Sequence, residues 1–275
     1  MLAAFKFSEA KKMTFDIVVV VYNLQLNQVK AISAFRGMEG VSIYVCDNST
    51  NAEIKDKNKP YAAKMGVQWL DMGGNVGLAR AYNSAIASGS GNVVCIFDDD
   101  TLPPETYLSR MEEAIEVGGT GCYLPLVRSG ETLLSPLRRR GPAITRVENP
   151  LAIPEGELYA FNTGMAVTRD VYNRIVYDEN LFIDYVDHSF MRSVHGLGIP
   201  VHVVGGIELQ QNYSRQTDDL ASALRRDVTF RCDVRKFHSA GGILETLYCE
   251  MYLFYRLLRN TLHFRTTAFI RLRRY

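Results

Sequence analysis

Short apolar runs, each ending in polar residues, constrain the fold of this chain more than any other feature. The first run, Phe15–Tyr22 (FDIVVVVY), is rich in β-branched residues, and similar runs follow at Val41–Cys46 and Val93–Phe97. Continuous apolar runs of this length predict strands buried on both faces, as in a parallel sheet. Segments that predict helices lie between them at Leu24–Arg36 and Val76–Ala87. This alternation predicts a doubly wound α/β sheet.

Polar side chains follow three of these strands directly, at Asn23, Asp47–Asn48 and Asp98–Asp100. In open α/β sheets, ligands bind outside the carboxyl ends of the strands. The sequence therefore predicts a ligand site where these three clusters meet.

The second half of the chain is less regular. Ser135–Pro154 contains several prolines and three consecutive arginines, which predicts a surface loop. Asp184–His195 predicts a helix that begins at an acidic cap. Gln216–Phe237 and Ile243–His263 predict two longer helices. A helix opened by Pro103–Pro104 is also expected, because proline is tolerated in the first turn of a helix.

Charge is distributed unevenly along the 275 residues. The composition, 47% hydrophobic and 22% charged, is that of a globular protein, and the net charge of +1 gives no indication of nucleic-acid binding. Residues 225–275 contain 11 Lys/Arg and 4 Asp/Glu, a net of +7, so the first 224 residues sum to −6. An acidic body is consistent with a site that uses a cation. We therefore expect a catalytic domain over residues 1–215 and a helical C-terminal extension over residues 216–275.

Cysteine usage and hydropathy predict a cytoplasmic location. The five cysteines form no CxxC pair, which favours reduced, buried thiols. The sequence contains neither a secretory signal nor a run of roughly 18 apolar residues long enough to span a membrane. We expect the protein to act in the cytoplasm, including the inner face of the cytoplasmic membrane.

The run Asp98-Asp99-Asp100 is the strongest candidate for a metal site. Three carboxylates on one turn repel each other, so holding them together without a cation is unfavourable. A divalent cation, Mn2+ or Mg2+, would relieve the repulsion and keep positions free for diphosphate oxygens. The alternative is an acidic turn that caps the helix after Pro103–Pro104.

Several segments, in order along the chain, resemble family 2 glycosyltransferases. They are VVVVYN (18–23), VCDNST (45–50), GGNVGLARAYNSAI (73–86), FDDD (97–100), FNTGMAV (161–167) and ENLFIDYVDHSFMRSVHGLG (179–198). The resemblance covers about residues 15–215 and matches best the bacterial rhamnosyl- and galactofuranosyltransferases. It implies an α/β fold of the GT-A type, with a doubly wound mixed sheet and a helical C-terminal extension.

The resemblance also implies roles in binding a nucleotide diphosphate sugar donor. The backbone around Val21 and Tyr22 would line the base pocket, and Asp47 would hydrogen-bond the pyrimidine ring or the ribose. A carboxylate at the end of a strand can accept a hydrogen bond from a ring N–H. The alternative for Asp47 is an Asx turn that closes the strand.

Three residues of the glycine-flanked turn and its helix, Asn75, Arg80 and Asn83, are further donor-binding candidates. Arg80 would pair with a phosphate, and the start of the helix offers free N–H groups. The alternatives are that Arg80 is a solvated helix residue and that Asn83 makes a buried contact between helices.

For the metal, the resemblance implies that Asp98 and Asp99 face the donor, with Asp98 at the ribose or the cation, and that Asp100 is the main metal ligand. The cation would neutralise charge on the leaving diphosphate. Relatives commonly carry a histidine ligand where this chain has Gln211. An amide oxygen binds Mg2+ more weakly than imidazole binds Mn2+, so metal dependence could be weakened here.

The resemblance implies that Asp187, which lies in FIDYVDHSF (182–190), is the general base. Inversion at the anomeric carbon requires a base on the face opposite the leaving group, where it takes the proton of the acceptor hydroxyl. Asp184, three residues earlier, is the main competitor. The alternative is that one or both aspartates only stabilise the N-terminus of the helix.

The resemblance implies transfer from dTDP-L-rhamnose, or from a UDP-sugar such as UDP-galactofuranose, to a glycan or lipid-linked glycan in the synthesis of bacterial O antigen or capsule. One rival is a sugar-1-phosphate nucleotidyltransferase, but VYNLQLNQ (21–28) lacks the glycine-rich basic loop that it would need. A second rival is a non-catalytic sugar-nucleotide-binding subunit, because the histidine is missing.

Aromatic residues and arginines alternate through residues 250–275. This pattern is typical of peripheral contact with an anionic membrane surface. It also fits a helix packed on the domain or against a second copy in a homo-oligomer.

Overall fold

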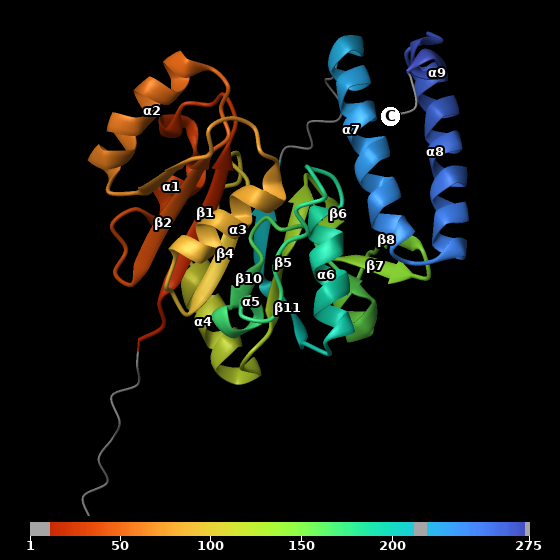
Figure 1. Cartoon of the computed structure of the whole chain (residues 1–275). Coiled ribbons are helices and arrows are strands. Elements are labelled where there is room, and N and C mark those ends of the chain that lie inside the picture. The colour runs from red at the N-terminus through yellow and green to blue at the C-terminus, as the bar shows by residue number, and fades with distance from the viewer. Residues whose placement is uncertain (1–11, 212–218, 273–275) are drawn as a thin grey trace, which may run out of the picture.

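A mixed sheet of eight strands forms the centre of the part of the chain, residues 12–211 and 219–272, that this computed structural model describes (Figure 1). The strand order is β11-β5-β10-β4-β1-β2-β3, and β6 pairs with β5. The strands are β1 (Phe15–Val21), β2 (Val41–Asp47), β3 (Gln68–Asp71), β4 (Val93–Phe97), β5 (Cys122–Ser129), β6 (Thr132–Ser135), β10 (Ala166–Thr168) and β11 (Val201–Gln210). Strands β4, β1, β2 and β3 are parallel, whereas β10 runs antiparallel to β4 and β5.

Helices cover both faces of the sheet because successive side chains of each strand point to opposite faces. Val18 of β1 packs in the same core cluster as Tyr82, whereas Ile17 and Val19 pack with Phe35 in the other cluster. The helices are α1 (Lys30–Phe35), α2 (Ala52–Met65), α3 (Leu78–Ser88), α4 (Tyr107–Gly118), α5 (Arg169–Tyr172) and α6 (Val186–Gly196), with 3-10 turns η1 (Leu26–Gln28), η2 (Pro150–Ala152) and η3 (Glu155–Glu157). The predicted doubly wound α/β sheet is confirmed.

The prediction of a surface loop over residues 135–154 is wrong for much of that segment. A hairpin of β7 (Leu137–Arg140) and β8 (Ala143–Arg146) pairs through β7 with β9 (Leu158–Tyr159) to form a second, three-stranded sheet in the described part of the chain. The strand β7 was not predicted because three of its four residues are arginines. In the structure Arg138 forms an ion pair with Glu157, and Arg139 contacts Tyr159.

Two predicted helix starts also need correction. The helix expected to begin at an acidic Asp184 cap begins at Val186, after Tyr185 in a left-handed conformation with φ 62°. The helix expected after Pro103–Pro104 begins at Tyr107, whose N–H donates to the Pro104 carbonyl in a preceding turn.

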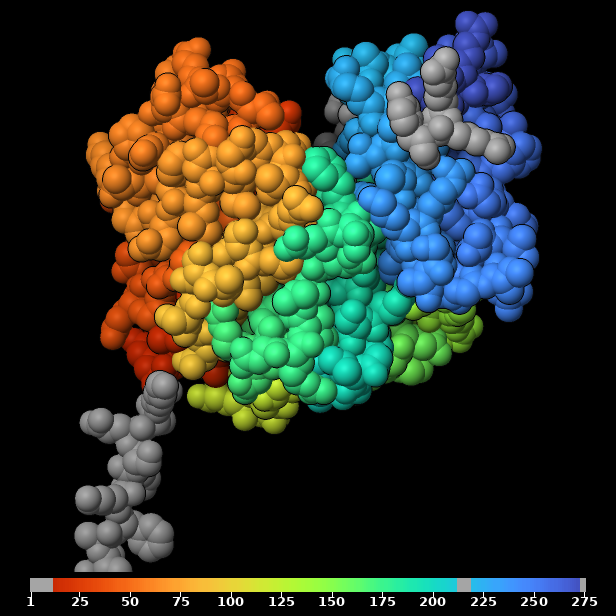
Figure 2. Space-filling model, in the orientation of Figure 1, coloured from red at the N-terminus to blue at the C-terminus, as the bar shows by residue number. Residues whose placement is uncertain are grey.

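The described part of the C-terminal region contains α7 (Leu220–Ser239), α8 (Ile243–His263) and α9 (Ala268–Arg271). Helix α7 lies beside the α6 segment, the connection between α7 and α8 lies near the second sheet, and α9 lies at the other end of α8 (Figure 1). Figure 2 shows their surface directly against the segment around α6. Helix α8 packs on the side of α7 that faces away from the sheet (Figure 1). Among the described residues, no helix is both long and apolar enough to cross a bilayer. Four of the five free cysteines are buried, and Cys232 is exposed.

Candidate functional site

A cavity of about 520 Å³ opens at the carboxyl ends of β1, β2 and β4, where the sequence predicts a ligand site. Parallel strands bring their carboxyl ends to the same edge, so residues far apart in the chain meet there. The lining residues are Val20, Tyr22, Asn48, Asn75, Leu78, Tyr82, Phe97, Asp98, Asp99, Asp100, Ile183, Gln211 and Arg226. Five predicted site residues are therefore brought together: Tyr22, Asn75, Asp98, Asp99 and Asp100.

The acidic turn after β4 supplies three of these residues. Burial, together with the neighbouring charges of Asp100 and Asp99, raises the pKa of Asp98 to about 7. Burial and Asp100 also raise the pKa of Asp99. The Asp98 backbone N–H donates to Thr163 Oγ1 at 3.1 Å, which anchors the turn to the loop before β10. The turn thus holds three carboxylates close together at the edge of the cavity.

Gln211, which occupies the position expected for a histidine ligand, contacts this turn. Its Nε2 donates to Asp98 Oδ2 at 2.5 Å, and its backbone N–H donates to the Arg128 carbonyl at the end of β5. Within residues 12–211 and 219–272, no group of three or more His, Cys, Asp or Glu side chains is arranged to hold a metal ion. The acidic turn still fits a cation chemically, because its carboxylates are hard oxygen donors that repel each other.

Asn75 is held just before the N-terminus of α3 by an Asx turn that its side chain forms. Its Oδ1 accepts the Gly77 N–H at 3.2 Å, and the Leu78 N–H donates to the Phe182 carbonyl at 2.7 Å. Gly77 has φ +88°, and a Cβ there would lie 2.7 Å from the Phe182 carbonyl oxygen, so only glycine allows this close approach. The start of α3 is therefore fastened to the segment before α6.

Val21 and Asp47 are fully buried and do not line the cavity. Asp47 Oδ1 accepts the Ser49 N–H at 2.8 Å, which is the Asx turn considered as the alternative, and Asp47 Oδ2 accepts from Asn58 at 3.4 Å. Their neighbours Tyr22 and Asn48 face the cavity instead. Asp47 supports the loop that carries Asn48, and a direct bond from Asp47 to a nucleotide stays a prediction.

Arg80 and Asn83 also lie outside the cavity lining. Arg80 is exposed and forms an ion pair with Glu179 at 3.5 Å. Asn83 donates to the Tyr177 carbonyl and to Glu179, and its Oδ1 accepts the Tyr177 N–H. The structure thus uses Asn83, which is only partly buried, to join α3 to the loop before α6, whereas the alternative considered for it was a buried contact between helices.

Asp187 lies in the first turn of α6, near the cavity but outside its lining residues. Its negative charge contributes to raising the pKa values of Asp98 and Tyr82, after the larger effect of burial. The Asp187 side chain is 20% exposed, and its Oδ1 accepts the His188 backbone N–H at 2.7 Å. Burial lowers the pKa of His188, whose ring packs against Tyr159 and whose Nδ1 lies 3.5 Å from Asp187 Oδ1.

Comparison with known proteins agrees with this geometry. A model of the family "Glycosyl transferase family 2" matches residues 16–176, more than half of the chain. The chain belongs to glycosyl transferase family 2. It is 24% identical over 207 residues to the dTDP-rhamnosyl transferase RfbF of Shigella flexneri, an alignment that covers 70% of this chain and 67% of that protein.

Solved glycosyltransferase structures share the fold. The mannosyltransferase PcManGT from Pyrobaculum calidifontis, in complex with GDP-Man and Mn2+, matches 94% of this chain and 74% of its own with TM-score 0.60 and 15% identity. Residues 1–349 of S. aureus TarS, in complex with UDP-GlcNAc, match 93% of this chain and 74% of their own with TM-score 0.54 and 13% identity. This family 2 glycosyltransferase therefore has the expected GT-A-type fold.

One residue that organises the site of this glycosyltransferase gives no local sequence signal. Asp233 on α7 is 1% exposed, and its carboxylate accepts the backbone N–H groups of Phe182, Ile183 and Asp184 at 2.9–3.1 Å. It thereby fixes the segment that contacts Gly77 and leads into α6. Sequence patterns miss Asp233 because its partners lie about 50 residues earlier in the chain.

Proposed function

We propose that this family 2 glycosyltransferase is an inverting, metal-dependent enzyme that transfers a sugar from a nucleotide diphosphate to a glycan hydroxyl. The observation that carries the proposal is one cavity at the carboxyl ends of the strands, lined by all three carboxylates of the acidic turn and electrostatically coupled to Asp187. In this proposal the acidic turn serves the leaving group, and Asp187 supplies the base that inversion requires.

Asp98 and Asp100 would hold Mn2+ or Mg2+. The ion, when bound, would neutralise charge on the leaving diphosphate. Gln211 keeps Asp98 oriented through its amide, and this contact competes with direct coordination by the same oxygen. We therefore expect weaker metal binding than at a site with a histidine ligand. A solved structure of the same fold contains Mn2+ with its nucleotide sugar, which supports the choice of ion.

Asp187 is proposed to take the proton of the acceptor hydroxyl. It lies in the first turn of α6, and its charge is felt by Asp98 in the donor cavity. Asp184 is the weaker candidate, since it lies before the helix and lines a different cavity.

The donor is proposed to be dTDP-L-rhamnose, with a UDP-sugar such as UDP-galactofuranose as the second choice. The relative RfbF, named as a dTDP-rhamnosyl transferase, supports the first choice. Tyr22 and Asn48 would contact the nucleoside, and Asn75 the diphosphate. We propose that the acceptor belongs to bacterial O antigen or capsule synthesis and is a glycan or lipid-linked glycan.

The outer face of α8 is proposed to contact a membrane surface. Its apolar side chains recur at helical spacing and are 47–77% exposed, whereas Leu253 and Cys249 on the opposite side are buried against α7. The exposed residues are Ile243, Leu247, Met251, Phe254, Leu258 and Leu262. A face of this kind is typical of a helix that lies in a membrane interface, and the net charge of +7 over residues 225–275 favours anionic lipid.

Donor binding with and without Mn2+ tests the proposed function. A panel of nucleotide sugars should include one that raises the melting temperature, because a ligand at 100 times its dissociation constant adds about 2.7 kcal/mol of stability. EDTA or Asp100→Asn should remove this shift. Asp187→Asn should keep donor binding but lower turnover on the order of 10²–10⁴-fold.

The result also separates the rivals. Donor binding without transfer or hydrolysis would identify a non-catalytic binding subunit. Synthesis of a nucleotide sugar from a nucleoside triphosphate and a sugar 1-phosphate would identify a nucleotidyltransferase.

A further inference from the structure

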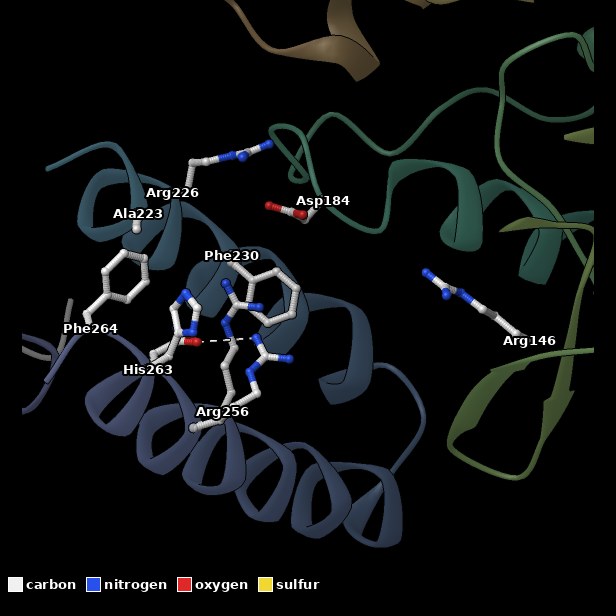
Figure 3. Close-up of a pocket in the computed structure, with 10 residues that line it drawn as sticks. Arg146, Asp184, Ala223, Arg226, Phe230, Arg256, His263 and Phe264 are labelled. Atoms are coloured by element: carbon white, nitrogen blue, oxygen red, sulfur yellow. Dashed lines mark hydrogen bonds between the residues drawn. The ribbon is translucent and has the colours of Figure 1, made fainter. Parts of the chain in front are cut away.

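A second cavity, of about 510 Å³, lies among α7, α8, the end of β8 and the loop before α6 (Figure 3). The residues that line it are Arg146, Asp184, Ala223, Arg226, Phe230, Arg256, Arg259, Asn260, His263 and Phe264. Four lining arginines face one lining carboxylate, that of Asp184, in this part of the described chain. The cavity is therefore strongly cationic, in contrast to the acidic donor cavity.

Helix α8 contributes Arg256, Arg259 and His263, which are spaced i, i+3 and i+7 and so share one helix face. Arg256 is held in place from two sides. Its Nε donates to the fully buried carboxylate of Asp227 at 2.9 Å, and its guanidinium lies 3.9 Å from the centre of the Phe230 ring. A cation fixed in this way loses little conformational freedom when it binds an anion.

The buried carboxylate does not neutralise the cluster. Asp227 also pairs with Arg231 at 2.6 Å, so a single negative charge is shared between two arginines. Arg259 is exposed, and its Nη2 donates to the neutral amide of Asn260 at 3.2 Å. Guanidinium groups with this surplus of positive charge match the geometry of phosphate oxygens.

This cavity adjoins the donor cavity. Arg226 lines both of them, and in Figure 3 its side chain extends from α7 toward the loop that carries Asp184. Ile183, which precedes Asp184 in the chain, lines the donor cavity. The carboxylate of Asp233 accepts hydrogen bonds from the backbone N–H groups of both residues. A molecule in the cationic cavity is thus placed at the border of the donor site.

We propose that the cationic cavity binds a phosphate or diphosphate group of the acceptor and so selects acceptors in which such a group adjoins the sugar. The proposal rests on the proposed function, since it names the class of molecule that receives the sugar. The arginines would bind the phosphate oxygens, and the rings of Phe230 and Phe264 would contact an apolar chain attached to the diphosphate.

Calorimetric titration of the full chain with octyl diphosphate in EDTA tests this directly. Without a divalent cation the acidic turn disfavours an anion in the donor cavity, so binding reports on the cationic cavity. Octyl diphosphate should bind at least tenfold more tightly than neutral octyl glucoside. Comparison with glucose 1-phosphate tells whether a lipid diphosphate or a phosphorylated glycan is preferred.

The decisive variant is Arg259→Gln, because Arg259 is exposed and makes no contact with buried Asp227. It should weaken octyl diphosphate binding about tenfold. Arg225→Gln is the matched control: Arg225 is an exposed arginine of α7 that does not line the cavity, and its substitution should change nothing. Absence of binding by the wild type, or equal affinity of the wild type and Arg259→Gln, would overturn the proposal.

Donor binding is measured on the same proteins with Mn2+. Because Arg259 does not line the donor cavity, its substitution should leave nucleotide-sugar binding unchanged. If the wild type binds no nucleotide sugar, the proposed function is contradicted. If it binds a nucleotide sugar but no octyl diphosphate, only this inference is contradicted. A variant that loses both ligands together would show a general structural defect and overturn the assignment of Arg259 to the anion.

Discussion

Asp98 is the residue whose environment most opposes its charge. Burial and the neighbouring carboxylates raise its pKa from 3.8 to about 7, so without a cation the folded protein retains a proton that the unfolded chain has released. Stability from this group is fully present below the unfolded pKa and is lost as the pH rises through about 7. Relative to Asp98→Asn, the wild type should lose about 4 kcal/mol between pH 4 and pH 8. Urea unfolding in EDTA at several pH values measures this difference.

A divalent cation should reverse this penalty by stabilising the ionised form of Asp98. Addition of Mn2+ at pH 8 should therefore raise the melting temperature of the wild type more than that of Asp98→Asn. Identical pH profiles for the two proteins in EDTA would show that Asp98 does not experience the repulsion inferred from its surroundings.

Between elements, the contact from Asp233 on α7 to the segment before α6 connects the C-terminal helices to the site. Asp233→Ala leaves the part-buried N–H groups of Phe182, Ile183 and Asp184 without their acceptor. The expected loss is about 3 kcal/mol of stability, because three backbone donors lose hydrogen bonds to one charged, buried carboxylate. Chemical denaturation measures it, and Asp219→Ala at the exposed cap of the same helix should cost only about 1 kcal/mol. Equal losses would mean that Asp233 acts only as a generic helix residue.

The elements also show how far the sequence predicts the site. Tyr22, Asn75 and the acidic turn were predictable, because polar residues after parallel strands meet at one edge of the sheet. That Arg80 lies outside the cavity was not predictable. The rotation of α3 about its axis depends on contacts with residues 177–179, which are distant in the chain. The Asp47 carboxylate accepts a hydrogen bond from the nearby Ser49 N–H. The local sequence allowed this Asx turn but did not require it.

For the fold, the apolar strands β1, β2 and β4 were predicted, whereas the apolar strand β5 and several elements rich in charge were not. Helix α2 carries few apolar residues, although Asn51, which caps its first turn, and the left-handed Gly66 at its end are recognisable signals. The β7–β8 hairpin escaped prediction because Arg138 and Arg139 bind Glu157 and Tyr159, which lie outside the hairpin.

Apolar surface and positive charge are concentrated in the C-terminal region of the molecule, which predicts binding to a membrane surface. Helix α8 presents an apolar face to solvent, and the C-terminal 51 residues, 225–275, carry a net charge of +7. Apolar area and positive charge together favour the surface of an anionic bilayer, each basic residue near the surface contributing about 1 kcal/mol. Vesicles of phosphatidylcholine with phosphatidylglycerol should therefore bind the protein in flotation assays, and high salt should weaken the binding.

Substitution of the face should abolish this binding without unfolding the protein. Phe254→Glu combined with Leu258→Glu places charge at positions that are 61% and 47% exposed. Val117→Glu, at an apolar residue of α4 that is 91% exposed, is the matched control and should bind vesicles as the wild type does. If the face instead pairs two copies of the chain, sedimentation would show a dimer that the double variant converts to a monomer, and vesicle binding would be absent from both. Only a monomer that loses vesicle binding on substitution of α8 agrees with a membrane-facing helix.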